Sequence, residues 1–412
     1  MKIAVWHNLP SGGGKRALYN HVSGLLRRGH TIEAWCPPTA DSTFLPLSGL
    51  VRENVVALDW PAPKRLSDKW QVTLETGRLL AAMDAHCRNC AEQMDADGFD
   101  ILFANSCMLL RTTSIGRFST LPSVLYLQEP YRWLYEALPR LPWLAAPRTG
   151  ATIAGLKAWF LDWRDIRNKR LQAREEVENA AAFDRVLVNS HFSRESLLRA
   201  YGLDSDVCYL GIDTGHFVPQ HLPREDYAVG FGSITPEKNL QFCIEAVGNT
   251  AAPHPKLVWI GNVATPSYLQ EMQALAVARG VVFEPKVGIP DHEVLDILGR
   301  AMVMLYAPRL EPFGLAPLEA NACGVPVLAV AEGGVRETIV DQVNGLLVDS
   351  HPAAMGAAIQ RLRDDPAFTR RLGAAAREAV ETKWGMEQAT RRLEQHLLRF
   401  ARVSPTIVDI TP

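Results

Sequence analysis

Short apolar segments alternate with longer segments of helical periodicity along most of this 412-residue chain. The short segments are rich in Val, Ile, Leu and Ala. They are KIAVW, TIEAWC, DILFANS, SVLYLQ, RVLVNS, YAVGFGS, KLVWIGN, VVFEP, MVMLYAP, VPVLAV and GLLVD. Most are followed by a stretch in which apolar residues recur every three or four positions. Buried strands that alternate with amphipathic helices are typical of parallel sheets covered on both faces. The pattern therefore predicts an α/β protein with doubly wound sheets.

A break in this pattern predicts two domains. Between Gly211 and Asp226 the chain contains Gly, Pro and charged residues but has neither the strand nor the helix period. A chain of this length can form two domains that each bury a core. We place an N-terminal Rossmann-like domain at residues 1–213 and a C-terminal one at 214–385. Residues 386–412 are expected to form a helix and a tail that pack back towards the N-terminal domain.

The charge balance argues against a nucleic-acid partner. The chain has 43 Lys and Arg residues against 45 Asp and Glu residues, a net charge of −2. Such a chain has no general attraction for nucleic acid or for an acidic membrane. It begins with a strand pattern rather than a signal peptide, and no run of about 18 apolar residues occurs in it. We expect a cytoplasmic protein.

One segment, residues 131–179, differs from the rest in composition. It contains Trp133, Trp143, Trp159 and Trp163, together with nine Lys or Arg residues and six Asp or Glu residues. Aromatic and basic residues together are typical of a surface that contacts lipid or an acceptor. In the alternative interpretation, the tryptophans cover the core of the N-terminal domain. The first interpretation predicts peripheral contact with the inner face of the membrane.

The cysteines are scattered and odd in number, which suits a reducing compartment. They are Cys36, Cys87, Cys90, Cys107, Cys208, Cys243 and Cys323. Only Cys87 and Cys90 form a C-x-x-C pair, and no second ligand cluster accompanies it. We interpret them as ordinary helix cysteines and expect no metal.

A glycine-rich loop, SGGGKRAL at residues 11–18, follows the first strand. It is not a nucleotide-hydrolase loop, because Leu9 stands where that motif has Gly and Arg16 where it has Ser or Thr. A dinucleotide fingerprint starting at Gly12 fails at Ala17. The loop still joins a strand to a helix, where backbone N–H groups favour an anion. It also allows a simpler interpretation as a tight turn.

The strongest candidate for chemistry is the run from Pro308 to Val348. Glu311 and Glu319 are separated by seven residues, and Phe313-Gly314-Leu315 lead from the first into a helix. Backbone N–H groups at a helix start donate to hydroxyl or phosphate oxygens, and a Glu carboxylate accepts two hydroxyls. Two such carboxylates are suited to a sugar and a ribose diol.

This run resembles the donor-sugar motif of the family 4 retaining glycosyltransferases, which have the GT-B fold of two Rossmann-like domains facing a central cleft. Four further segments resemble that family in the same order: GGGKRALYNHVSGLLRRGH, DRVLVNSHFSRESLLRAYG, YLGIDTGHF and FGSITPEKNL. The resemblance implies transfer of a hexosyl group from a GDP- or UDP-linked sugar to a hydroxyl of a saccharide or glycolipid. We expect a role in bacterial polysaccharide or glycolipid synthesis.

The resemblance also implies roles for residues of the second domain. Glu311 would bind the donor sugar with the backbone N–H groups of Phe313, Gly314 and Leu315, and Glu319 would bind the ribose hydroxyls. The resemblance is weaker for the residues that would contact the nucleotide base. It suggests backbone contacts around Val287, next to Lys286.

Further roles concern the diphosphate. Lys238 would neutralise it, and Gly12 and Gly13 would approach it from the opposite domain. Catalysis would then depend on stabilising the leaving diphosphate, with the acceptor proton passing to one of its oxygens. No cofactor is implied, and no Asp-x-Asp motif at a strand end requires a catalytic metal.

Two departures from the family pattern stand out. Ser233 occupies the place of an Arg that would bind the diphosphate, and the candidates to compensate are Arg16, Arg309 and Arg336. Gln128 occupies the place of a His near the reacting carbon. Gln orients a hydroxyl but does not accept its proton at neutral pH. Glu129 is the alternative, although adjacent strand residues point to opposite faces.

Two other classes of function stay open from the sequence. A nucleotide-sugar epimerase or a phosphorylase would share the fold. A non-catalytic subunit that binds nucleotide would explain Ser233 and Gln128, but the presence of Lys238, Glu311 and Glu319 argues against it.

Overall fold

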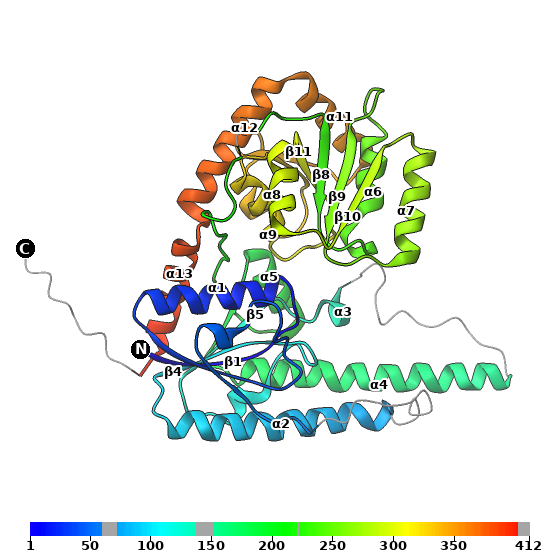
Figure 1. Cartoon of the computed structure of the whole chain (residues 1–412). Helices are drawn as coiled ribbons and strands as arrows, with labels where there is room; N and C mark the ends of the chain where they lie inside the picture. The colour runs from blue at the N-terminus through cyan, green and yellow to red at the C-terminus, as the bar shows by residue number, and fades with distance from the viewer. Residues whose placement is uncertain (60–71, 137–151, 221, 403–412) are drawn as a thin grey trace, which may run out of the picture. The chain divides into compact units, whose positions relative to one another are not determined.

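The computed structural model describes residues 1–59, 72–136, 152–220 and 222–402. They form two compact units, drawn in Figure 1. Unit 1 comprises Met1–Asn189, Ser193–Tyr209 and the chain from Thr390 onwards. Unit 2 comprises Ser190–Phe192 and Leu210–Ala389.

Unit 1 contains a seven-stranded parallel sheet with the order β3-β2-β1-β4-β5-β6-β7. The strands are β1 (Lys2–Asn8), β2 (Thr31–Cys36), β3 (Arg52–Val55), β4 (Ile101–Cys107), β5 (Ser123–Gln128), β6 (Arg185–Val188) and β7 (Asp206–Val207). The helices are α1 (Gly13–Arg27), α2 (Val72–Ala96), α3 (Arg132–Tyr135), α4 (Ile153–Ala181) and α5 (His191–Tyr201). In Figure 1, α1 covers one face of this sheet, and α2 and α4 pack together on the other.

The middle strands of unit 1 are buried on both faces, which explains their uninterrupted apolar sequences. Trp6 on β1 and Trp35 on β2 are adjacent in register, and both are almost fully buried. Phe103 on β4 is also fully buried. Each such side chain contributes about 1.5–3 kcal/mol when it leaves water. The sheet is therefore held mainly by the residues that predicted it.

Unit 2 contains a six-stranded parallel sheet with the order β10-β9-β8-β11-β12-β13. The strands are β8 (Tyr227–Phe231), β9 (Lys256–Gly261), β10 (Phe283–Val287), β11 (Val303–Tyr306), β12 (Val327–Val330) and β13 (Gly345–Val348). The helices are α6 (Leu240–Val247), α7 (Pro266–Ala278), α8 (Asp291–Arg300), α9 (Leu315–Ala322), α10 (Val335–Thr338), α11 (Pro352–Asp364) and α12 (Pro366–Ala379). Trp259 fills the core opposite Gly230, where a Cβ would collide with its ring.

The C-terminal helical region is interrupted before α13. A π-helical turn, Val380–Trp384, follows α12, and α13 (Met386–Phe400) starts after Gly385. Within unit 1, Glu394 of α13 accepts a hydrogen bond from Arg28 Nε at 2.8 Å and forms another with His30 Nε2 at 2.7 Å. These contacts attach the later part of α13 to the end of α1.

The predicted α/β architecture with parallel sheets is confirmed, and every strand named from the sequence is present. Two strands were missed, β3 and β7, which lie at the two edges of the sheet in unit 1. Both are short and only partly buried, so their residues lack the apolar run of a central strand. Among the described residues, no helix combines the length and apolar character that crossing a membrane requires.

Candidate functional site

A strand–turn–helix in unit 2 carries the candidate phosphate-binding Lys. Strand β8 leads through Gly232, which has φ +147°, into a short 3₁₀ turn at Pro236–Lys238. Asn239 has φ 54° and starts α6, while its Nδ2 donates to the Ala307 carbonyl oxygen at 3.1 Å. This bond ties the turn to the residues that follow β11. The backbone thereby places Lys238 beside the loop that contains Glu311.

Lys238 and Glu311 form an ion pair. Lys238 Nζ donates to Glu311 Oε1 and to Glu311 Oε2, each at 3.0 Å. Their side chains are 28% and 22% exposed, so the pair is reachable from solvent yet partly shielded. A cation and a carboxylate at one accessible point are suited to a ligand that has both an anionic group and hydroxyls.

Two glycines that the sequence analysis did not select shape the Glu311 loop. Gly334 N donates to the Glu311 carbonyl oxygen at 2.8 Å. A Cβ on Gly334 would overlap the carbonyl oxygen of Pro312, and one on Gly333 would come within 2.5 Å of the Glu311 oxygen. The loop packs directly on this backbone, so only glycine fits. The sequence signal that could have identified them is the adjacent pair Gly333-Gly334 shortly after the predicted strand VPVLAV.

Helix α9 begins just after this loop. Gly314 has φ 88° and precedes Leu315, the first helical residue, so the first N–H groups of α9 have no carbonyl partner within the helix. Phe313 is 2% exposed, and its ring contacts Trp384 with centroids 5.8 Å apart. Glu319 lies inside α9 and is only 4% exposed. The two predicted carboxylates therefore differ in access to solvent.

Other predicted residues of unit 2 lie on loops or at strand ends. Ser233 Oγ donates to Asn262 Oδ1 at 3.2 Å. Val287 ends β10 and is 45% exposed, while Lys286 pairs with Glu284 at 2.9 Å. Arg336 is one of the residues expected to compensate for the Arg that Ser233 replaces. Its Nε donates to the Gly333 carbonyl oxygen at 3.1 Å. That bond places Arg336 at the base of the Glu311 loop.

In unit 1, the glycine-rich loop lies at the start of α1. Gly12 has φ +137° and precedes Gly13, the first residue of the helix. A Cβ on Gly14 would lie 3.5 Å from the Gln128 side-chain nitrogen, so the third glycine packs closely on the end of β5. Gln128 has φ 69°, a conformation that side chains rarely adopt outside special sites. The structure thus brings Gln128 to the glycine loop.

Glu129, the alternative to Gln128, is held by two arginines. Its Oε1 accepts from Arg111 Nη2 at 2.7 Å, and its Oε2 lies 3.7 Å from Arg132 Nε. The Glu129 carboxylate is therefore already engaged by two cationic side chains.

The tryptophans of α4 do not cover the core. Ile153 is 91% exposed, Leu156 67%, Trp159 60% and Trp163 47%. The core interpretation is therefore wrong for Trp159 and Trp163. Trp143 lies in residues 137–151, outside the described residues, and so does the Trp133 side chain.

All seven cysteines are free and buried. Cys87 Sγ lies 3.4 Å from Thr113 Oγ1, and burial raises the pKa of Cys87 to about 12. Cys90 Sγ lies 3.5 Å from His86 Nε2. The C-x-x-C pair sits within α2, as the helix interpretation predicts.

Two Rossmann-like units with parallel sheets, one of them with a Lys–Glu pair beside a helix start, match the GT-B fold that the sequence motifs imply. Family models match almost all of the chain: "Glycosyl transferases group 1" over residues 213–379 and "Glycosyltransferase Family 4" over residues 11–216. The second match spans half of the chain, and the chain therefore belongs to Glycosyltransferase Family 4.

Relatives and solved structures agree with this assignment. The D-inositol 3-phosphate glycosyltransferase of Thermomonospora curvata is 29% identical over 66% of this chain and 71% of its own. That of Streptomyces coelicolor is 31% identical over 60% of this chain and 64% of its own, so less than two thirds of this relative is spanned. Anabaena HepE in complex with UDP has a TM-score of 0.69 and 17% identity, with 96% of this chain and 99% of that chain covered. Sucrose-phosphate synthase of Thermosynechococcus elongatus has a TM-score of 0.67 and 19% identity over 97% and 98%. The two structures show the fold.

Proposed function

We propose that this protein transfers a hexosyl group, with retention of anomeric configuration, from a nucleoside diphosphate sugar to a hydroxyl of a saccharide or glycolipid. The observation that carries the proposal is the solvent-accessible Lys238–Glu311 ion pair of unit 2. Its cation matches the donor diphosphate, and its carboxylate matches the sugar hydroxyls.

Donor binding requires the ion pair to separate. In the free protein the Lys238 ammonium donates hydrogen bonds to both Glu311 carboxylate oxygens, each at 3.0 Å. A diphosphate that competes for Lys238 releases Glu311, and sugar hydroxyls then replace the ammonium as its donors. A complete donor satisfies both residues, whereas a nucleoside diphosphate satisfies only Lys238. The pair therefore favours the intact donor over the product.

The other assigned residues would act through hydrogen bonds. The backbone amides of Phe313, Gly314 and Leu315, at the start of α9, would donate to donor oxygens, and Glu319 would accept from the ribose. Gly12 and Gly13 offer amide groups to an anionic oxygen at the start of α1. Their role needs no side chain, which suits a loop made of glycine.

The leaving group is expected to take the acceptor proton. Gln128 has no basic atom at neutral pH, and its role would be to orient the acceptor hydroxyl. Lys238 and the amides stabilise the diphosphate as the glycosidic bond breaks, and one diphosphate oxygen accepts the proton. This scheme assigns no step to a metal or a cofactor.

UDP and GDP are the donor bases to compare first. The structural neighbour HepE holds UDP and UDP-glucose in its crystal structures, which makes UDP sugars the starting point. The curated relatives named D-inositol 3-phosphate glycosyltransferase suggest that polyol acceptors belong in the same screen.

The testing experiment combines binding with product analysis. A nucleoside diphosphate bound only by the native protein raises the melting temperature, and the panel includes UDP, GDP and ADP. The matching sugar nucleotide is then incubated with acceptors, and the anomeric configuration of the product is read by NMR. Retention supports the proposal. Binding without turnover indicates the non-catalytic subunit, and acceptor-free interconversion indicates the epimerase.

We also propose that the first half of α4 contacts an anionic membrane surface. One face of α4 carries apolar side chains at intervals of three or four residues: Ile153, Leu156, Phe160 and Trp163. The same face continues with Arg167, Arg170 and Arg174, so that an apolar stripe is followed by a basic one. Asp162 and Asp165 fall on the opposite side of the helix by this spacing. An apolar stripe continued by arginines matches a headgroup region of negative charge.

Vesicle sedimentation tests this contact. The wild-type protein is expected to sediment with vesicles that contain phosphatidylglycerol and much less with pure phosphatidylcholine. Trp159→Ser combined with Trp163→Ser should remove this binding without changing the melting temperature, because both side chains are exposed. Leu198→Ser on α5, an exposed apolar residue elsewhere in unit 1, is the matched control. Equal sedimentation of the double variant and the wild type would contradict the contact.

A further inference from the structure

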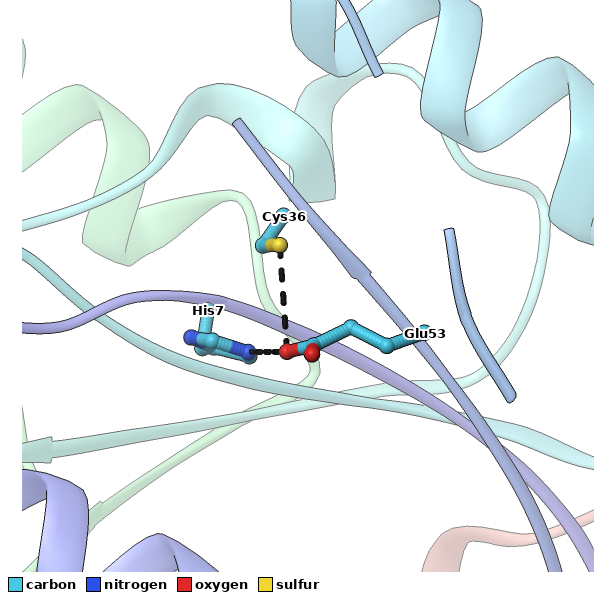
Figure 2. Close-up of side chains that lie close together, drawn as sticks. All are labelled: His7, Cys36 and Glu53. Carbon is cyan, nitrogen blue, oxygen red and sulfur yellow. Dashed lines mark hydrogen bonds and ion pairs between the residues drawn. The ribbon is translucent and has the colours of Figure 1, made fainter. Parts of the chain in front are cut away.

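Three side chains with metal-binding atoms meet at one point of unit 1. They are His7 on β1, Cys36 on β2 and Glu53 on β3, shown in Figure 2. His7 Nε2 lies 3.0 Å from Glu53 Oε1, and Cys36 Sγ lies 3.8 Å from the same oxygen. All three ligand atoms lie within 4.8 Å of one another.

These distances suit one small cation. Zinc binds nitrogen, sulfur and oxygen at about 2.0–2.3 Å, so the ligand atoms of a tetrahedral site lie roughly 3.3–3.8 Å apart. The His7–Glu53 and Cys36–Glu53 distances are close to this range. Ligand adjustments of a few tenths of an ångström would admit the ion between these two pairs.

The burial of the cluster restricts the size of its ligand. His7 is 0% exposed, Cys36 is 4% exposed, and the Glu53 side chain is 9% exposed. A sugar or nucleotide cannot enter such a space without a large rearrangement, whereas a single ion can. A thiolate and a carboxylate also supply two negative charges, which balance a divalent cation in a region that water does not screen.

Two buried polar atoms nearby have no hydrogen-bond partner within the part of the chain that the structure describes. One is His7 Nδ1, and the other is the Nζ of Lys15, a residue that is 1% exposed. Lys15 lies close enough to interact electrostatically with Glu53 and Cys36. A buried polar group without a partner is costly and commonly marks a missing water or ion. The unpartnered Lys15 ammonium, which interacts electrostatically with Glu53 and Cys36, is therefore the candidate donor to a further ligand of an ion bound there.

The cluster also lies where parallel α/β sheets bind ligands. His7 and Cys36 are at the carboxyl ends of adjacent strands, and Lys15 is in the first turn of the helix that follows β1. Ligands of such sheets bind outside these carboxyl ends.

We propose that His7, Cys36 and Glu53 bind one divalent transition-metal ion of the zinc type, with an exogenous oxygen ligand held by Lys15. The thiol proton of Cys36 leaves to solvent when the ion binds. The ion joins three adjacent strands, including the short edge strand β3, and thereby stabilises this edge of unit 1. Metal binding here does not require that the protein transfers a sugar.

Cobalt provides the direct test, because a thiolate bound to Co²⁺ gives a charge-transfer absorption in the near ultraviolet. Metal-free full-length protein is titrated with Co²⁺ and then with Zn²⁺. The expected result is one equivalent bound, with a thiolate absorption that zinc abolishes and a raised melting temperature. Cys36→Ser should remove the absorption, and His7→Gln should weaken metal affinity by at least about 100-fold.

Cys90→Ser and Cys243→Ser are the controls. Cys90 is the other cysteine beside a histidine, and Cys243 is a buried cysteine of unit 2. Both variants should keep the full absorption. The absence of a thiolate absorption in the wild type overturns the proposal, and this result does not depend on the folding of any variant. Absorption that persists in Cys36→Ser and disappears in Cys90→Ser moves the site to α2 and also overturns it.

Discussion

Lys238 Nζ lies 3.0 Å from each carboxylate oxygen of Glu311, although the two residues are 73 positions apart in the chain. The pair connects the turn after β8 with the loop after β11, which are adjacent strands. Each residue holds the other in place in the free protein. The same arrangement makes their roles separable by mutation, because each role depends on a different part of the donor.

Replacing Lys238 removes the cation assigned to the diphosphate. For Lys238→Ala we expect kcat/KM for the donor to fall by about 10²–10³-fold, since the leaving group loses its charged donor. Release of nucleoside diphosphate from the sugar nucleotide measures this. Lys256→Ala is the control, because Lys256 also pairs with a carboxylate, Glu284, at 3.2 Å on the same sheet. Unchanged turnover of Lys238→Ala in a folded protein would remove it from this role.

Replacing Glu311 separates binding of the product from transfer. In Glu311→Gln, Lys238 no longer pairs with a carboxylate, so nucleoside diphosphate should bind a few-fold more tightly. This is the effect expected from the loss of a partly exposed ion pair worth about 0.5–1 kcal/mol. Sugar transfer should fall by at least about 100-fold. Isothermal titration and a turnover assay measure the two effects.

Glu237→Gln is the matched control for this variant. Glu237 is exposed and lies in the same turn as Lys238, so it changes the net charge equally. The interpretation fails if Glu311→Gln weakens nucleoside diphosphate binding, or if Glu237→Gln strengthens it as much.

Gly334→Ala tests whether the glycine pair shapes the Glu311 loop. The new Cβ would overlap the Pro312 carbonyl oxygen and lie 2.7 Å from its carbon, so the loop must move. We expect a loss of about 1–3 kcal/mol in stability, together with weaker donor binding. Gly77→Ala in α2 is the control, because no atom lies within 4 Å of its Cβ position. It should leave donor binding unchanged, and equal behaviour of the two variants would contradict the packing argument.

His21 should make the protein less stable in acid. Burial, followed by the positive charge of Arg392, lowers the pKa of His21 to about 4. In the unfolded chain His21 has a pKa of about 6.5, so between pH 6.5 and 4 it binds a proton that it does not bind in the folded protein. The free energy of unfolding therefore falls as the pH drops from about 6.5 to 4. The full loss from this group is roughly 3 kcal/mol.

The variant His21→Phe isolates this effect. Phe is a neutral ring for a position that contacts Tyr126, with centroids 5.4 Å apart. Urea unfolding of both proteins at pH 7, 6 and 5 gives the free energy of unfolding, and other titrating groups cancel in the comparison. The wild type should lose more stability than the variant below pH 6.5. Parallel curves would show that His21 is not the group responsible.

The central strands and the order of the motifs were predictable because both are local properties. Buried strands can be predicted from apolar runs in the sequence, without knowing which strands lie beside them. The runs that contain Trp6, Phe103 and Trp259 are examples. The edge strand β3 was not predictable, since its RENV sequence is half exposed and has no such run. As a result, Glu53 was not considered, and the cluster with His7 and Cys36 was missed.

By itself, the sequence determined two parallel α/β halves, the family motifs and the identity of Lys238 and Glu311 as candidates. Only the tertiary structure showed that these two residues form an ion pair and that the Glu311 loop packs on Gly333 and Gly334. It also showed that three adjacent strands bring His7, Cys36 and Glu53 together. The physical reason is that periodicity records how much each residue is buried. Which residues meet depends on strand order and register, which arise only when the whole sheet assembles.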